Sequence, residues 1–303
     1  MSVGYLSISR VFYSNSGGGD MRILRENDFF HSEQHAFCLF SMNNQLMEGV
    51  HGHDFDELVI VRSGSGFHIV NDLVRFICQG DFFLVTANDT HSYVSTNNLS
   101  VINILIRRPR SFHFLQHIDN LLDCIKEKLL QPTALALTQG ALARIEVLSQ
   151  EIISRNESNY DVLYFSLCEV ALLNIINTLC QCDRQTEALS PDERGRANLI
   201  RMLKTSSLRH LDWNVLSDDN GVARRTMYRL IKRVTGYTPV KFQMLYRVLK
   251  AQELLRTTDK TISEIAARCG FMNAIRLTES YRRYFHYPPS HERELHSRVL
   301  IAI

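Results

Sequence analysis

The fold of this chain is decided by a stretch near its end, residues 211–236, which reads LDWNVLSDDNGVARRTMYRLIKRVTG. Apolar residues recur in it at three-and-four spacing, at Met227, Ile231 and Val234, so they line one face of a helix. The Asn-Gly pair in the middle of the stretch is a turn signal. The stretch therefore predicts two helices joined by a tight turn, a helix-turn-helix unit over residues 214–235.

A second unit of the same kind follows at residues 261–285, TISEIAARCGFMNAIRLTESYRRYF. Thr261 and Glu264 fit a capping box, and Asn273 can cap the next helix after a Cys-Gly-Phe turn. These signals predict a helix-turn-helix over residues 261–284. Between the units, Thr238-Pro239 begins a connecting helix of about 18 residues, roughly 27 Å long. Such a helix would place two reading helices about one turn of DNA apart.

The face opposite the packed one is basic in the first unit. Arg225 and Arg229 are four residues apart and project from the same side, where a guanidinium can pair with O6 and N7 of guanine. We expect Arg224 and Lys232 to lean toward phosphates. A polar, solvated helix surface is the plainer interpretation, but the second copy of the unit favours DNA. The predicted DNA-binding residues are Arg224, Arg225, Tyr228, Arg229 and Lys232 in the first unit and Asn273, Ile275, Arg276 and Glu279 in the second.

Charge is distributed unevenly along the chain. The net charge is +2, yet from Asn198 onward there are 19 Lys and Arg against 9 Asp and Glu, so the rest of the chain is acidic. A basic C-terminal third suits a phosphate backbone. No Ser-His-Asp, phosphate-loop or dinucleotide pattern is visible, so we expect no enzyme of those classes.

Cysteine usage and hydropathy indicate in which cellular compartment the protein is expected. The seven cysteines form no paired CxxC framework, which favours reduced thiols in a cytoplasm. Cys180-x-Cys182 is a possible metal fragment, but packing is its commoner role. We find no apolar run of membrane-spanning length, so we expect a cytoplasmic protein without a membrane partner.

The first half of the chain reads as β-structure, with short apolar runs between glycines and asparagines. AFCLFSM, LVIVRSGSGFHIVN, VRFICQGDFFLVT and VINILI predict a small barrel or sandwich. Within it His51, His53 and Glu57 follow an HxHxxxE pattern, and His91 comes later. Histidines two apart share a face of a strand. Such a cluster can hold zinc, iron or manganese, hydrogen-bond a ligand, or serve only the structure.

Residues 112–181 change to helical spacing. One amphipathic stretch has Phe114, Ile118, Leu121, Leu122, Ile125 and Leu129, a second has Leu142, Ile145, Leu148 and Ile152, and a nearly apolar run follows from Val162 to Leu179. We expect residues 1–20 to be a disordered extension, or Met21 to be the true start. The predicted domains are 21–111 for the barrel, 112–181 for the helices, 182–197 for a linker and 198–298 for the two helix-turn-helix units.

These motifs resemble the AraC/XylS family of bacterial transcription regulators. The likeness is carried by RTMYRLIKRVTGYTP (225–239), RVLKAQELL (247–255) and IAARCGF (265–271). Ala223 departs from the pattern, because serine commonly caps the first reading helix there. In the first half, HDFDELVIVRSGSGFHIVND (53–72) and GDFFLVTANDTHSY (80–93) look like the N-terminal domain of the L-rhamnose regulators of enteric bacteria, and HxHxxxE resembles a cupin motif.

The resemblance implies an α+β protein, with an N-terminal cupin-like β-barrel, a helical dimerisation segment and a C-terminal all-α domain. It implies a homodimeric activator of a carbohydrate catabolic operon, responsive to a rhamnose-like sugar. The effector, a monosaccharide, would bind among His51, His53, Glu57 and His91 without metal or cofactor, and Glu264 would touch the sigma subunit of RNA polymerase. Two alternatives stay open: a metal-dependent cupin enzyme fused to a DNA-binding domain, and a constitutive regulator without an effector.

Overall fold

The computed structural model describes residues 22–30, 32–43, 49–109, 111–130, 136–155, 160–182, 198–200, 202–203, 213, 217 and 223–301. The chain divides into two compact units, Met1–Asn71 with Ile77–Asn198 and Asp72–Phe76 with Leu199–Ile303. Three predicted features lie outside the described residues: the extension 1–20, the linker from 183 to 197, and most of the first helix of the first helix-turn-helix unit.

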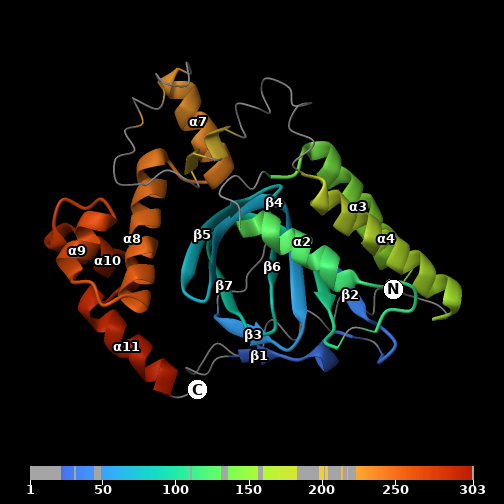
Figure 1. Ribbon diagram of the computed structural model, residues 1–303. Coiled ribbons are helices and arrows are strands. Elements are labelled where there is room, and N and C mark those ends of the chain that lie inside the picture. The colour runs from blue at the N-terminus through green and yellow to red at the C-terminus, as the bar shows by residue number, and fades with distance from the viewer. Residues whose placement is uncertain are drawn as a thin grey trace. The chain divides into compact units, whose positions relative to one another are not determined.

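The structure contains a seven-stranded sheet, and all of its strands except most of β5 belong to the first unit. Its strands are β1 (Arg22–Leu24), β2 (Phe37–Met42), β3 (His51–His53), β4 (Asp56–Val70), β5 (Leu73–Cys78), β6 (Phe82–Val85) and β7 (Thr90–Ile106). The order is β1-β3-β7-β4-β5, with β2 added on β7 and β6 on β4. β4 and β7 each pair with several partners along their length, and the sheet curves into the predicted barrel-like shape (Figure 1).

Alternation along β4 explains how the barrel is filled. Leu58 and Ile60 belong to a hydrophobic cluster that includes the helices, whereas Val59 and Val61 belong to a second cluster with Phe83 and other strand residues. Successive side chains of a strand point to opposite faces, so one set packs outward against the helices and the other fills the barrel. Glu57 shares the face of Val59 and Val61, and the strand therefore directs a carboxyl group into the barrel interior.

The long β4–β7 ladder bends at Gly64. The register shifts between Val61 and Phe67, as expected for β-bulges. Gly64 has φ +74°, and a Cβ at this position would overlap the backbone of Asn97 and Asn98. Only glycine fits this left-handed, crowded position without strain, so the bend is encoded by one residue.

Three helices cover one face of the barrel: α2 (Ile118–Leu130), α3 (Gln139–Ser154) and α4 (Val162–Cys180) (Figure 1). Thr138 caps α3 through Ala141 N, and Asp161 caps α4 through Tyr164 N. Their apolar stripes join the outer cluster of the sheet. The prediction that Phe114 begins the first stripe is wrong, because Phe114 precedes α2 and is 51% exposed.

Helix α4 is long and apolar enough to cross a membrane by length and composition, so the expectation that no run reaches this length is wrong. Half of its most apolar window is buried inside the protein, as in the core helix of a soluble domain. Glu169 in its middle is buried and accepts hydrogen bonds from the backbone N–H groups of His113, Phe114 and Leu115 at 2.7–2.8 Å. Helix α4 therefore packs in the protein core, and it also holds the loop before α2 in place.

The second unit contains α7 (Arg224–Thr235), α8 (Pro239–Thr257), α9 (Ile262–Arg268), α10 (Ala274–Phe285) and α11 (Pro289–Ile301). The predicted caps are confirmed: Thr238 caps α8 with Pro239 in its first turn, Thr261 and Glu264 form a capping box on α9, and Asn273 caps α10. Gly270 has φ +77° in the turn between α9 and α10. Helix α11 was not predicted; it begins at Pro289, shortly after α10 ends at Phe285.

A buried carboxylate ties three of these helices together. Glu292 of α11 accepts hydrogen bonds from Arg256 Nε of α8 at 2.6 Å, from the hydroxyl of Tyr281 of α10 and from the hydroxyl of Tyr287 at 2.7 Å. Burial alone would raise the pKa of Glu292, but Arg256 and the two tyrosine hydroxyls outweigh burial and lower the pKa. The charged form therefore contributes to holding α10 in place.

Candidate functional sites

Helix α7 separates apolar and basic residues on opposite faces. Met227 and Ile231 are buried, while Arg225 and Arg229 are exposed. The other predicted DNA-binding residues of this helix are also exposed: Arg224, Tyr228 and Lys232. Ala223 occupies the N-cap and makes no side-chain cap, as its sequence indicates, and Gly236 ends the helix with φ +78°. Helix α7 thus presents a basic face, and the major groove of DNA is wide enough to admit an α-helix.

Helix α10 repeats the arrangement with different chemistry. Leu277 and Tyr281 are fully buried, and Ile275 is 68% exposed. Arg276 and Glu279 are exposed and form an ion pair at 2.9 Å. The side-chain oxygen of Asn273 accepts from Arg276 N at 3.0 Å, so this oxygen serves as a cap. Met272, in the preceding turn, is 90% exposed beside these residues and was not predicted; its turn position carries no periodic signal.

Glu264 lies at the exposed start of α9. Its carboxylate accepts hydrogen bonds from Thr261 N and Thr261 Oγ1, both at 2.8 Å. These hydrogen bonds lower the pKa of Glu264, so its charge is retained at neutral pH. The residue predicted to touch RNA polymerase is therefore also a structural cap.

The predicted effector residues come together inside the barrel. His51 and His53 are on β3, Glu57 is on β4 and His91 is on β7, where it pairs in register with His51. All four are buried, with exposed fractions of 2–7%. The ring centroids of His51 and His91 are 4.2 Å apart. Residues far apart in the sequence thus form one polar cluster in an apolar interior.

In this cluster the carboxyl group of Glu57 faces ring nitrogens of two histidines. Glu57 Oε2 lies 3.8 Å from His53 Nε2 and 3.4 Å from His91 Nε2. The opposite nitrogens are occupied: His53 Nδ1 donates to Phe55 O at 2.6 Å, and His51 Nδ1 donates to Gly49 O at 3.1 Å. Among the described residues, neither His53 Nε2 nor His91 Nε2 has a hydrogen-bond partner. Buried polar atoms without partners are rare and point to a ligand.

Two further members of the cluster were missed. His68 Nε2 lies 3.0 Å from His91 Nδ1, and the hydroxyl of Tyr93 is buried without a partner among the described residues. Tyr93 lies two residues after His91, so strand periodicity was a signal that could have found it. His68 faces Tyr93 across the β4–β7 ladder, and this register is not visible in one sequence.

Burial determines the charge of the cluster. It lowers the pKa of His51 to about 4 and holds those of His53 and His91 below their ordinary value. Burial also raises the pKa of Glu57 to about 8. A low-dielectric interior disfavours every charged form. Without a ligand, the cluster is therefore mostly uncharged at neutral pH.

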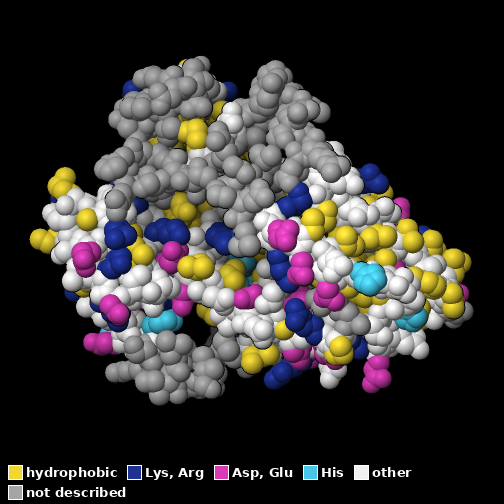
Figure 2. Space-filling model, in the orientation of Figure 1, with side chains coloured by type: hydrophobic (Ala, Val, Ile, Leu, Met, Phe, Trp, Pro, Cys, Tyr) yellow, Lys and Arg dark blue, Asp and Glu magenta, His cyan; other side chains and the backbone are white. Residues whose placement is uncertain are grey.

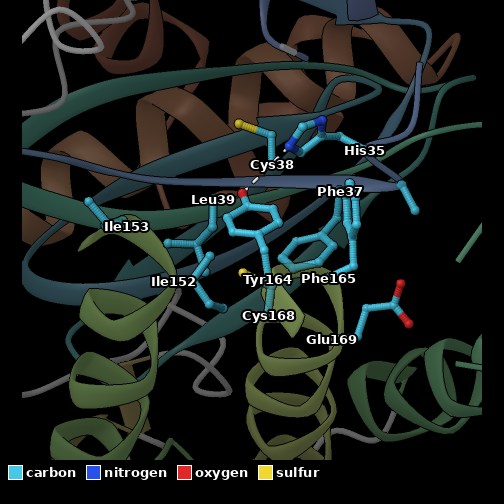
Figure 3. A pocket seen from close by; sticks show the side chains of 11 residues that line it. His35, Phe37, Cys38, Leu39, Ile152, Ile153, Tyr164, Phe165, Cys168 and Glu169 are labelled. Carbon is cyan, nitrogen blue, oxygen red and sulfur yellow. Dashed lines mark hydrogen bonds between the residues drawn. The ribbon is translucent and has the colours of Figure 1, made fainter. Parts of the chain in front are cut away.

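A separate pocket lies between strand β2 and helices α3 and α4 (Figure 3). Its lining is largely apolar, with Phe37, Leu39 and Ile152, and the hydroxyl of Tyr164 approaches His35 Nε2 at 3.5 Å. It shares no residue with the histidine cluster. The buried polar groups that a hydroxyl-rich ligand requires lie in the barrel and not in this pocket.

Two protein-family matches cover the barrel part and the helix-turn-helix part of the chain separately. Residues 36–145 match the AraC-like ligand binding domain, and residues 216–294 match a helix-turn-helix domain. The chain is 29% identical over 274 residues to the HTH-type transcriptional activator RhaS of Enterobacter sp. (strain 638), covering 90% of this chain and 98% of that protein. It is also 29% identical to RhaS of Citrobacter koseri, covering 89% and 96%.

A solved structure, an AraC-type transcriptional regulator from Chromobacterium violaceum, is 27% identical and covers 35% of this chain and 94% of its own, with a TM-score of 0.32. The two RhaS relatives are transcriptional activators, and neither match indicates an enzyme family. A ligand-binding barrel followed by a DNA-binding domain, matched in that order over most of the chain, identifies it as a transcription regulator of the AraC family.

Proposed function

We propose that this regulator is an activator of carbohydrate catabolic genes that responds to a rhamnose-like monosaccharide. The proposal rests on the cluster of His51, His53, Glu57 and His91, whose unpartnered polar atoms suit the hydroxyl groups of a sugar. The similarity to the RhaS activators along nearly the whole chain supports it. Differential affinity of the sugar for one arrangement of the protein supplies the energy of switching.

DNA recognition is assigned to α7 and α10. Arg225 and Arg229 read bases in one major groove, while Arg224 and Lys232 contact phosphates and Tyr228 supports them. Asn273, Ile275, Arg276 and Glu279 read the next groove. Helix α8 has 19 residues, and its length of about 28 Å matches the spacing of successive grooves.

Dimerisation is assigned to α3 and α4. Leu163, Leu167 and Val170 recur at helical spacing on α4 and are 63%, 36% and 55% exposed, and Val147 of α3 is 60% exposed. Figure 2 shows hydrophobic side chains gathered over these two helices. Monomeric proteins seldom leave such a contiguous apolar face in water, so a second copy of the chain is its expected cover.

Activation is assigned to Glu264, whose exposed carboxylate is held in one orientation by its cap and can meet a basic surface of the RNA polymerase sigma subunit. A surface acid that only caps its helix would leave transcription unchanged when replaced. Glu264→Gln retains a capping group, so its effect on transcription in vitro, with DNA affinity measured in parallel, separates the two roles.

The effector is tested by the thermal unfolding of the full chain in a panel of L-rhamnose, other deoxyhexoses, hexoses and pentoses. We expect one sugar class to raise the unfolding temperature, and His53→Ala to remove this response while leaving DNA affinity intact. A chain that binds its operator and responds to no sugar would instead be the constitutive regulator.

A further inference from the structure

We propose that the barrel holds one divalent transition-metal ion, bound by His53 Nε2, His91 Nε2 and Glu57 Oε2. The site lies within the proposed effector site but does not depend on any effector. Its three ligand atoms come from three different strands, β3, β4 and β7.

The spacing of the three atoms suits an ion. They lie within 4.8 Å of one another, and Glu57 Oε2 is 3.4 Å from His91 Nε2 and 3.8 Å from His53 Nε2. Ligand atoms at zinc distances in tetrahedral geometry are about 3.4 Å apart. An ion placed between them would lie within reach of all three once the side chains adjust.

The hydrogen bonds orient lone pairs toward this point. Phe55 O can only accept, so the proton of His53 lies on Nδ1 and its Nε2 offers a lone pair. That lone pair faces the oxygen of Glu57, and no hydrogen bond joins them. Metal-bound histidines typically donate their other ring nitrogen to a carbonyl, as His53 does here.

The second imidazole is supported in a similar way. His91 Nδ1 lies 3.0 Å from His68 Nε2, which fixes the ring with Nε2 toward Glu57. His51 stands beside the site and donates through Nδ1 to Gly49 O, so its Nε2 also keeps a lone pair. Two imidazoles and one carboxylate suit zinc or iron(II) and leave at least one coordination position. That position is open to water or to a hydroxyl oxygen of an effector.

The test uses the full chain without an affinity tag, purified without added metal. We expect close to one zinc or iron per chain by elemental analysis. After removal with EDTA, Co²⁺ is expected to restore one equivalent and to give the visible absorption of a low-symmetry site. Glu57→Gln and His91→Gln are expected to weaken Co²⁺ binding at least tenfold.

A matched control is His35→Gln, because His35 is equally buried in the same unit and bonds Ser32 Oγ through Nδ1. It is expected to keep full metal binding. The seven free thiols also bind metals, so the difference between variant and control isolates the barrel site. If a variant fails to fold, the wild-type chain decides: Zn²⁺ must raise its unfolding temperature.

The proposal is overturned if the wild-type chain takes up no Co²⁺ or Zn²⁺, or if Glu57→Gln binds as much as His35→Gln. Neither result touches the proposed sugar response, because metal uptake is measured without sugar. Conversely, a metal-loaded chain that responds to no sugar would keep this site and lose the proposed effector.

Discussion

At the scale of single residues, helical periodicity predicted which side chains are exposed. The basic residues of α7 and the predicted DNA-binding residues of α10 lie on the faces that three-and-four spacing indicates, because burying Ile231, Leu277 and Tyr281 leaves the opposite faces in water. The barrel cluster was only partly predictable. His51 and His53 share a strand face by their spacing, but the contact of His68 with His91 depends on strand register, which a single sequence does not reveal.

Arg225→Ala or Arg229→Ala is expected to cost about 1–3 kcal/mol of DNA-binding free energy and to relax preference at the base it reads. Lys232→Ala is expected to weaken all sequences alike and to lower the slope of log K against log salt by about one. Fluorescence anisotropy with operator and scrambled duplexes measures both effects. Lys126→Ala, an exposed change on α2, is the control. Unchanged operator affinity in both arginine variants would remove α7 from base reading.

At the scale of elements, capping signals predicted α8, α9 and α10 closely, because each cap is local in sequence. The length of strand β7 was underestimated. Only VINILI in its second half is an apolar run, and its first half, from Thr90, is held by cross-strand pairs with β3 and β4. Helix α11 was missed because its packing depends on the distant contact between Glu292 and Arg256.

Glu292→Ala is expected to destabilise the second unit by about 1–3 kcal/mol at pH 7, because it leaves the hydroxyl of the buried Tyr281 without its acceptor and leaves Arg256 with Asp72 as its remaining carboxylate partner. Urea unfolding followed by the fluorescence of Trp213, the single tryptophan, reports this unit. Glu294→Ala, an exposed change two residues away, is expected to change little.

The same carboxylate sets a pH dependence. Because the folded pKa of Glu292 is lowered, its contribution is complete above the ordinary value of 4.5 and is lost as pH falls through the folded pKa. Wild type and Glu292→Ala are therefore expected to converge in stability below about pH 4.5. A difference that persists undiminished at pH 3 would show that packing, and not charge, holds α11.

At the scale of the whole molecule, charge asymmetry and the change from β to helical patterning predicted an acidic sensing half and a basic reading half. Pairing of subunits could not be derived from periodicity, since an apolar helix face packs equally well inside one chain. Only the structure shows which apolar residues of α4 stay exposed after the rest of the helix has packed against the barrel.

Leu163→Glu with Val170→Asp is expected to convert the proposed dimer to a monomer, because two charges would have to enter its apolar interface. Light scattering after size exclusion measures the mass. Val240→Glu is the control, because it adds an acidic side chain at an apolar residue of α8 that is 61% exposed and lies outside the proposed interface. It is expected to leave the mass unchanged. A double variant that keeps the mass of a dimer would place the interface elsewhere.

Reading of two successive grooves by α7 and α10 is tested most directly by letting the full-length protein select duplexes from a random pool. Wild type is expected to select two sequence blocks about 10 base pairs apart. Arg225→Ala is expected to blur one block and Arg276→Ala the other. Selection of a single block, or loss of the same block in both variants, would contradict it.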